Sequence, residues 1–167
     1  MRPLLRLLGF LAGFAIVACG GPTFQGNVFR GDEISFRVGP YPRDWRAIDV
    51  DGALLSFRDD AAPATVAVNG RCGIDGDDVP LQALTHHLFL NFTDRQVLSQ
   101  APLELDGREA LRTEMVAELD GVPRKFVVFV LKKDGCVYDF VWIGPARDSE
   151  PRIGEFERFV LGFSTEV

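Results

Sequence analysis

The side chains that could catalyse a reaction or bind a metal are few and poorly grouped in this sequence. His86 and His87 are adjacent, and neighbouring residues on a helix point about 100° apart, so the pair does not converge on one metal ion. No serine lies in a Gly-x-Ser-x-Gly segment, and no glycine-rich loop precedes Lys-Ser or Lys-Thr. The sequence therefore predicts a protein that is not an enzyme and that holds no metal or cofactor.

The densest acidic group consists of Asp75, Asp77 and Asp78. Oxygen ligands of this kind suit Ca²⁺, but no glutamate follows at the distance that closes a calcium-binding loop. Turn formation and capping of a following helix explain these carboxylates with fewer assumptions. Asp59-Asp60 is interpreted as part of a solvated loop.

The first nineteen residues have the pattern of an export signal. Arg2 and Arg6 give a basic start, and residues 7–18 are apolar or small up to Cys19. A basic start, a short hydrophobic stretch and small residues before a cleavage site are typical of exported proteins. The segment Ile16-Val17-Ala18-Cys19-Gly20 resembles the lipobox of bacterial lipoproteins.

The lipobox resemblance implies that a signal peptide, residues 1–18, is removed and that Cys19 carries the acyl chains that hold the protein at a membrane. It also implies that an uncharged residue at Gly20 sends the protein to the outer membrane, facing the periplasm. A plain secretory signal and a membrane-spanning anchor are the alternatives. A spanning helix needs about 20 apolar residues, and the uncharged run Leu7–Ala18 is shorter.

Assigning Cys19 to lipid leaves Cys72 and Cys136 as an even pair in an oxidising compartment. We predict a disulfide between them, which would close a loop of about 65 residues and stabilise the fold by about 4 kcal/mol. Two buried free thiols are the alternative. The sequence contains no Cys-x-x-Cys, which argues against redox catalysis.

The mature chain is acidic. Once Arg2 and Arg6 leave with the signal peptide, 16 basic side chains remain against 24 acidic ones, a net charge of −8. An acidic surface is repelled by phosphate backbones. We therefore expect no nucleic acid partner.

Residues 19–30 are interpreted as a lipidated tether because they are rich in Gly, Pro, Gln and Asn. Residues 31–167 are expected to form one globular domain. Its first strand is predicted over 33–38, where apolar and polar residues alternate. Further short strands are expected at 45–50, 53–58 and 64–68, with a hairpin turn at Asp51-Gly52.

Two helices are predicted, and both begin near a proline. Asp77 or Asp78 caps the first, which has Pro80 in its first turn and one apolar face made by Leu81, Leu84, Leu88 and Phe92. Ser149 caps the second, which has Pro151 in its first turn and a buried stripe made by Ile153, Phe156, Phe159, Val160 and Phe163.

The strongest pattern is the recurrence of Asp-Gly at 106–107, 120–121 and 134–135. Tight Asp-Gly turns join antiparallel strands, so the segments 108–119, 122–132 and 136–143 are predicted to form a meander. Leu103–Leu105 is expected to add a fourth strand at its front. The fold class is therefore α+β, with helices on an antiparallel sheet that contains a three- to four-strand meander.

This arrangement is similar to the PsbP-like superfamily, which includes the extrinsic photosystem II subunit, Mog-type and DcrB-type proteins. The resemblance spans residues 30–165 and is carried by core and turn positions, namely Phe36, Gly39-Pro40-Tyr41-Pro42, Trp45, Val137-Tyr138-Asp139-Phe140 and Leu161-Gly162-Phe163-Ser164. It implies an α/β/α sandwich and a role in binding or assembly.

Four aromatic residues, Tyr41, Trp45, Tyr138 and Trp142, are candidates for a partner-binding patch, if several share an exposed face. Packing in the core is the alternative. The main hypothesis for function is a membrane-anchored, non-catalytic binding or assembly module of the bacterial cell envelope with an unidentified protein partner. The other is a periplasmic carrier that holds an apolar or anionic small ligand between sheet and helix.

Overall fold

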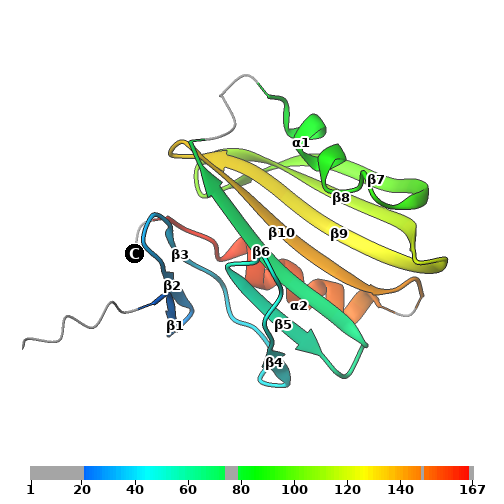
Figure 1. The fold of residues 1–167 in the computed structure, drawn as a ribbon, viewed down its shortest axis with the longest axis horizontal. Coiled ribbons are helices and arrows are strands. Elements are labelled where there is room, and N and C mark those ends of the chain that lie inside the picture. The colour runs from blue at the N-terminus through cyan, green and yellow to red at the C-terminus, as the bar shows by residue number, and fades with distance from the viewer. Residues whose placement is uncertain (1–20, 74–78, 148, 166–167) are drawn as a thin grey trace, which may run out of the picture.

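The computed structural model describes residues 21–73, 79–147 and 149–165. These residues form a seven-stranded sheet in the order β4-β5-β6-β10-β9-β8-β7 and a small sheet in the order β1-β2-β3. Every strand pair is antiparallel. The helices lie on opposite faces of the large sheet, α1 over β8 and β9 and α2 behind the middle of the sheet (Figure 1). The predicted α+β sandwich around an antiparallel sheet is confirmed.

The elements have the following bounds: β1 Thr23–Gln25, β2 Val28–Arg30, β3 Ser35–Arg37, β4 Trp45–Ala47, β5 Leu55–Asp59, β6 Ala64–Cys72, α1 Leu81–His87, β7 Thr93–Leu105, β8 Arg108–Leu119, β9 Val122–Lys133, β10 Cys136–Pro145 and α2 Glu150–Leu161. Within the described ranges, neither helix has the length and apolar character that crossing a bilayer requires.

The three Asp-Gly pairs are the turns of the meander. Asp106, Asp120 and Asp134 have φ angles of 49°, 53° and 54°, and the glycine after each also has a positive φ. Two successive residues with positive φ define the type I′ turn, whose twist matches that of paired strands. The predicted meander is confirmed, and its four strands, β7 to β10, run consecutively.

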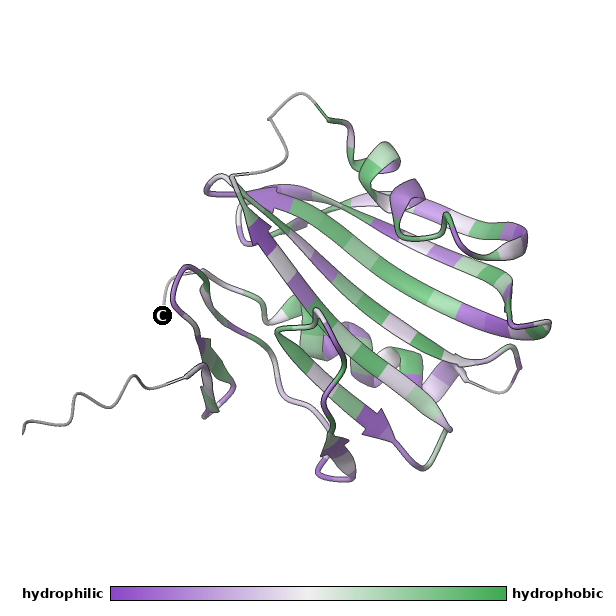
Figure 2. Ribbon diagram, viewed as in Figure 1, coloured by the Kyte–Doolittle hydropathy of each residue, from purple (hydrophilic) through white to green (hydrophobic). Residues whose placement is uncertain are grey.

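Strand β9 lies inside the sheet, and its middle is apolar on both faces, which Figure 2 shows as a green stretch between hydrophilic ends. Its residues alternate between two separate cores. Phe126, Val128 and Val130 contribute to the core under α1, whereas Phe129 and Leu131 contribute to the core under α2. A strand covered on both faces needs apolar residues at every position.

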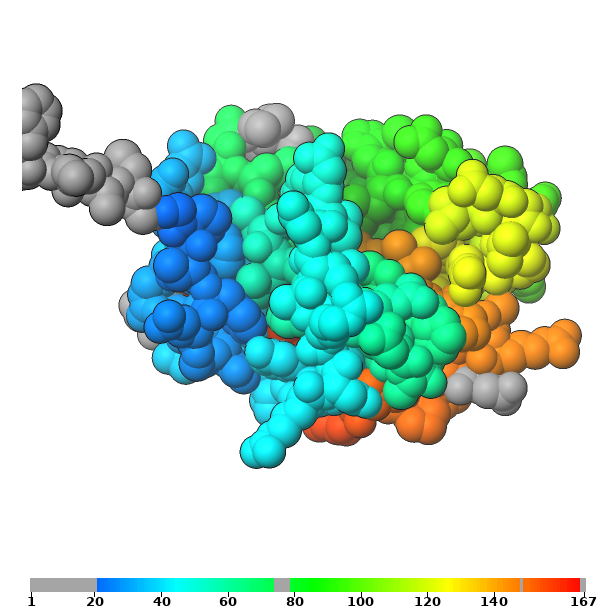
Figure 3. Space-filling model, turned by 60° about the horizontal axis from the view of Figure 1, so that its bottom comes forward, coloured from blue at the N-terminus to red at the C-terminus, as the bar shows by residue number. Residues whose placement is uncertain are grey.

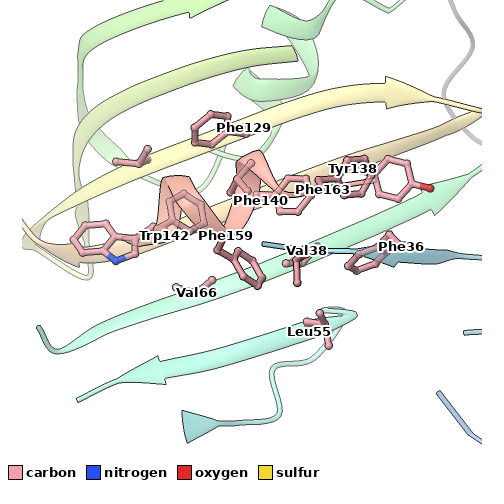
Figure 4. Packing of buried hydrophobic residues seen from close by; sticks show 14 of the residues in the cluster. Phe36, Val38, Leu55, Val66, Phe129, Tyr138, Phe140, Trp142, Phe159 and Phe163 are labelled. Carbon is pink, nitrogen blue, oxygen red and sulfur yellow. The ribbon is translucent and has the colours of Figure 1, made fainter. Parts of the chain in front are cut away.

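The larger core lies between α2, the large sheet and the small sheet. The predicted stripe of α2 is buried as expected, with Phe156, Phe159 and Val160 at 0% exposure. These side chains meet Phe140, Trp142 and other aromatic residues from the strands (Figure 4). Ser149 is the N-cap residue of α2, as predicted, but its side chain makes no capping hydrogen bond, because the hydroxyl donates to the carbonyl of Pro145 at 2.7 Å instead.

The predicted tether differs from the structure after residue 22. Residues 23–30 form the hairpin of β1 and β2, whose turn has positive φ at Gly26 and Asn27. Phe29 is 3% exposed and stacks on Phe36 with ring centroids 5.1 Å apart. The folded part therefore begins before residue 31, because these strands are too short to show alternation.

Two further elements differ in length from their predictions. Helix α1 ends at His87, and Phe89 and Phe92 pack on Phe126 from the turns that follow. Strand β7 covers 93–105 rather than 103–105. It is the last strand of the sheet and is exposed along most of its length, so burial imposes no alternation on its sequence. The proposed helix caps Asp77 and Asp78 lie outside the described residues.

Candidate binding site

The predicted disulfide is confirmed. Cys72 at the end of β6 and Cys136 at the start of β10 face each other in the register of the two strands and form a disulfide. Gly73 extends the pairing through a hydrogen bond from its N–H to the carbonyl of Gly135 at 3.1 Å. The disulfide therefore links the end of β6 to the start of β10 at the rim of the sheet.

The four aromatic residues that were candidates for an exposed patch belong to the core. Trp45, Tyr138 and Trp142 are 5%, 3% and 0% exposed, so a shared exposed face is excluded. Tyr41 is half-buried, and its ring lies 5.0 Å from that of Phe57. Burial raises the pKa of the Tyr138 phenol, and the nearby Asp134 raises it further. The alternative, packing in the core, is correct. The ring of Trp45 lies 5.7 Å from that of Phe159 on α2, and the ring of Tyr138 lies 6.2 Å from that of Phe36 on β3.

A hollow lies between the small sheet and the end of β6. We call it the rim pocket. It has a volume of about 420 Å³, within the range of about 300–1,000 Å³ typical of ligand sites. Its wall has apolar residues Phe29, Ile34 and Leu54 and charged residues Asp32, Glu33 and Arg71. In Figure 3 the small sheet (blue) and the segment before β5 (cyan) stand on either side of the green surface of β6.

A tight turn and a glycine shape the rim pocket. Gly31 donates to the carbonyl of Ile34 at 2.9 Å, and this turn between β2 and β3 presents Asp32 and Glu33 to solvent. Gly70 lies on the opposite side, where an added Cβ would come within 2.9 Å of Ile34 and Leu54 side chains. The absence of a side chain at Gly70 therefore lets Ile34 and Leu54 pack closely over this glycine.

The charges around the rim pocket differ in their pairing. Arg71 donates to the carboxylate of Asp139 at 2.9 Å, and Asp139 is fully buried. Asp32 and Glu33 are exposed and have no ion-pair partner among the residues that the structure describes. The mouth of the pocket thus carries two negative charges that are available to a ligand.

Elsewhere, buried charges hold elements together. Arg152 of α2 pairs with Asp59, which is fully buried at the end of β5. The prediction that Asp59 lies in a solvated loop is therefore wrong, although Asp60 is exposed. The hydrogen bond with Asp59 raises the pKa of Arg152. This pair joins the helix to the sheet.

Lys125 forms a second internal contact of this kind. Its ammonium group lies 2.7 Å from Glu150 at the start of α2 and 3.2 Å from Glu114 on β8. The hydrogen bond to Glu150 raises the pKa of Lys125 against the opposing effect of burial. The lysine therefore stays charged and ties α2 to the sheet.

Asp106, in the turn between β7 and β8, also joins two parts of the structure. Its carboxylate lies 2.9 Å from the Lys133 ammonium group and accepts a hydrogen bond from the Thr165 N–H at 2.9 Å. Burial acts to raise the pKa of Asp106, but these donors outweigh burial and lower it. The C-terminal segment is thereby fastened to the meander.

The remaining candidates for chemistry do not converge. The described residues contain no group of three or more His, Cys, Asp or Glu side chains placed to hold a metal ion. His86 lines a second hollow of about 300 Å³ beside α1, where Arg95 lies 3.5 Å from its ring. Cys19 and the acidic group Asp75, Asp77 and Asp78 lie outside the described residues.

The rim pocket was not predicted from the sequence, because Asp32, Glu33 and Gly70 belong to no recognised binding motif. The available signal was the segment Gly31-Asp32-Glu33, a short polar turn between two strands.

Comparison with known proteins identifies the fold of this chain but does not assign the chain to a family. No protein-family model matches the chain, and no curated protein matches its sequence. Among solved structures, cyanobacterial PsbP (CyanoP) from Synechocystis sp. PCC 6803 is 13% identical, with a TM-score of 0.57, over 93% of this chain and 98% of that one. The chain has a PsbP-like fold. The predicted resemblance is thus confirmed for the fold.

Two further structures have the same fold. LpqN of Mycobacterium tuberculosis, described as involved in cell envelope biogenesis, is 16% identical with a TM-score of 0.56 over 86% of this chain and 88% of LpqN. A protein from Bacteroides thetaiotaomicron VPI-5482 is 13% identical with a TM-score of 0.55 over 79% of this chain. The match spans 45% of that longer protein.

Proposed function

We propose that this protein is a lipid-anchored, non-catalytic binding module of the bacterial cell envelope and that the side bearing the rim pocket contacts its partner. The Cys72–Cys136 disulfide is the observation that carries this proposal, since such bonds persist in oxidising compartments. The lipobox-like segment ending at Cys19 supplies the anchor. The shared fold with LpqN, a protein of cell envelope biogenesis, supports the same setting.

The distribution of charges supports binding rather than catalysis. The buried acids Asp59 and Asp139 are paired with arginines, and the pairs join structural elements. The unpaired acids of the rim pocket lie at its exposed mouth, where they are suited to attract a partner of opposite charge.

The anchor would also determine which side of the protein faces the membrane. Pro22 lines the rim pocket, and two residues, Gly20 and Gly21, separate it from Cys19. The three residue steps from Cys19 to Pro22 span at most about 11 Å. Acylation at Cys19 would therefore hold the pocket close to the membrane surface, within reach of other envelope proteins.

The packing of the larger core argues against the carrier hypothesis. A carrier needs a deep apolar pocket between sheet and helix. Between α2 and the sheet, the side chains of Phe129, Phe140 and Phe156 are at most 1% exposed and fill this space. The hollow beside α1 is open and partly polar, so the binding module is the better account.

The anchor is tested by expressing the full-length protein and its Cys19→Ser variant in a bacterium, with an alkyne-bearing fatty acid in the medium. We expect label on the unaltered protein and its recovery with membranes. The variant should lose both. Label that is absent from the unaltered protein, or retained by the variant, would contradict the proposed anchor.

The binding side is tested by placing a photo-crosslinking amino acid at Glu33 in living cells. The matched position is Glu109, an exposed acid at the start of β8, which lies three strands away from β6 in the sheet. We expect one discrete adduct from position 33 and none from 109. Equal crosslinking from both positions, or none from 33, would argue against a partner at the rim pocket.

A further inference from the structure

Strand β6 is longer than its neighbour β5. Its pairing with β5 runs from Asp59↔Ala64 to Leu55↔Val68, whereas β6 continues to Cys72. Figure 1 shows the end of β6 extending past β5 toward the small sheet. In the described part of the chain, no strand pairs with Gly70 or Cys72 on this side.

The backbone groups of this edge point into the rim pocket. Leu54 donates to the carbonyl of Val68 at 2.8 Å on the β5 side of β6, whereas Gly73 donates to the carbonyl of Gly135, just before β10, on the other side. Backbone groups along a strand alternate between its two edges. The N–H and C=O groups of Gly70 and Cys72 therefore point to the same side as those of Val68, and both residues line the pocket.

The other long edge of the sheet is protected against a further strand. Pro102 removes one donor from β7, and the register of β7 with β8 shifts between Thr93 and Gln96 and again between Val97 and Ser99. A proline and bulges on an edge strand oppose pairing with another chain. The edge of β6 at Gly70 and Cys72 has none of these features.

We propose that the free edge of β6 in the rim pocket binds an extended peptide segment of the envelope partner, which adds as a further strand beside Gly70 and Cys72. An unpaired strand edge recognises an extended backbone, and adjacent pockets select its side chains. Phe29, Ile34 and Leu54 favour an apolar side chain. The unpaired carboxylates of Asp32 and Glu33 favour a lysine or arginine next to it.

This proposal rests on the proposed function for the presence of the partner, but its test does not depend on lipidation. The probe is a fluorescein-labelled peptide of about six alternating leucine and lysine residues. Two matched peptides replace lysine by glutamate or carry N-methyl groups on alternate peptide bonds. Binding to the full-length protein in detergent is followed by fluorescence anisotropy, and amide hydrogen exchange of Gly70 and Cys72 is followed by NMR.

We expect the leucine–lysine peptide to bind and to slow exchange at Gly70 and Cys72. The glutamate peptide should bind about tenfold more weakly, and the N-methylated peptide should not bind. The double variant Asp32→Lys and Glu33→Lys should reverse the preference between lysine and glutamate peptides. Glu104→Lys and Glu109→Lys change the net charge equally at a pair of facing exposed acids on β7 and β8, three or more strands away from β6. They should leave the preference unchanged.

Absence of binding, equal binding of the N-methylated peptide, or unchanged exchange at Gly70 and Cys72 would overturn the proposal. Protection of these amides that depends on protein concentration without any peptide would also overturn it, because a second copy of the chain would then occupy the edge. The Cys19→Ser variant separates this test from that of the anchor. Peptide binding without membrane attachment would contradict only the anchor, and attachment without peptide binding would contradict only the site.

Discussion

Gly162, just after α2, lies directly against the backbone of Gly39, between β3 and β4. A Cβ built on Gly162 would lie 2.3 Å from the Cα of Gly39, and one built on Gly39 would lie 2.1 Å from the carbonyl oxygen of Arg158. Gly39 also donates to the carbonyl of Phe159 at 2.8 Å. This contact fastens the end of α2 to the segment that follows the small sheet.

Replacing Gly39 by alanine should destabilise the protein by about 1–3 kcal/mol, because the obstructing atoms belong to the backbone and cannot rotate away. Gly154→Ala is the matched control inside α2, where the added methyl group meets no close atom. It should stabilise by about 0.5–1 kcal/mol through helix propensity. Urea unfolding measures both. Effects of the same sign would contradict the close approach of the two backbones.

Arg152→Met should destabilise the protein by about 3–5 kcal/mol, because it leaves the buried carboxylate of Asp59 without its charged partner. Arg158→Met is the control. Arg158 is exposed and has no ion-pair partner among the described residues, so its loss should change stability by less than about 0.5 kcal/mol. Similar unfolding midpoints for the two variants would show that the Arg152–Asp59 pair does not hold α2 to the sheet.

Removing the disulfide with the double variant Cys72→Ala and Cys136→Ala should lower the free energy of unfolding by about 2–5 kcal/mol. A reducing agent should lower the stability of the unaltered protein by a comparable amount and leave the variant unchanged. The measurement is urea unfolding with and without reductant. A reductant that has no effect on the unaltered protein would mean that the bond does not form.

The lowered pKa of Asp106 makes stability depend on pH in the acidic range. The ionised carboxylate binds Lys133 and Thr165 in the folded state. Its contribution is complete above the carboxyl pKa of the unfolded chain, about 3.9, and is lost as the pH falls through the lower folded pKa.

Asp106→Asn should therefore unfold at lower urea concentration at neutral pH and lose less stability than the unaltered protein between about pH 5 and pH 2. Asn tolerates the positive φ of this turn position. Asp120→Asn is the control, since Asp120 holds the same place in the next turn and has no ion-pair partner in the described ranges. Identical pH profiles for the unaltered protein and Asp106→Asn would contradict the role of Asp106.

The sequence was most informative where local chemistry determines local structure. The three Asp-Gly pairs specified type I′ turns and hence the meander, and the stripe ending at Phe163 specified the buried face of α2. The pairing of Cys72 with Cys136 followed from the number of cysteines and the predicted export signal.

What the sequence did not indicate depends on contacts between distant segments. Strand β7 is exposed, so its residues show no alternation, and the small sheet consists of three-residue strands. Asp59 was predicted to lie in a solvated loop because its partner, Arg152, is distant in the sequence. The rim pocket forms between β6 and the small sheet. No local sequence pattern indicates that these two parts of the chain lie side by side.

The most direct test of the account is intact-mass and peptide mass spectrometry of the native protein isolated from membranes. We expect the chain to begin at Cys19 with acyl groups attached and to contain one disulfide between Cys72 and Cys136. A soluble chain that retains Met1 and carries free thiols at both positions would contradict the proposed export and anchoring, and with them the envelope function.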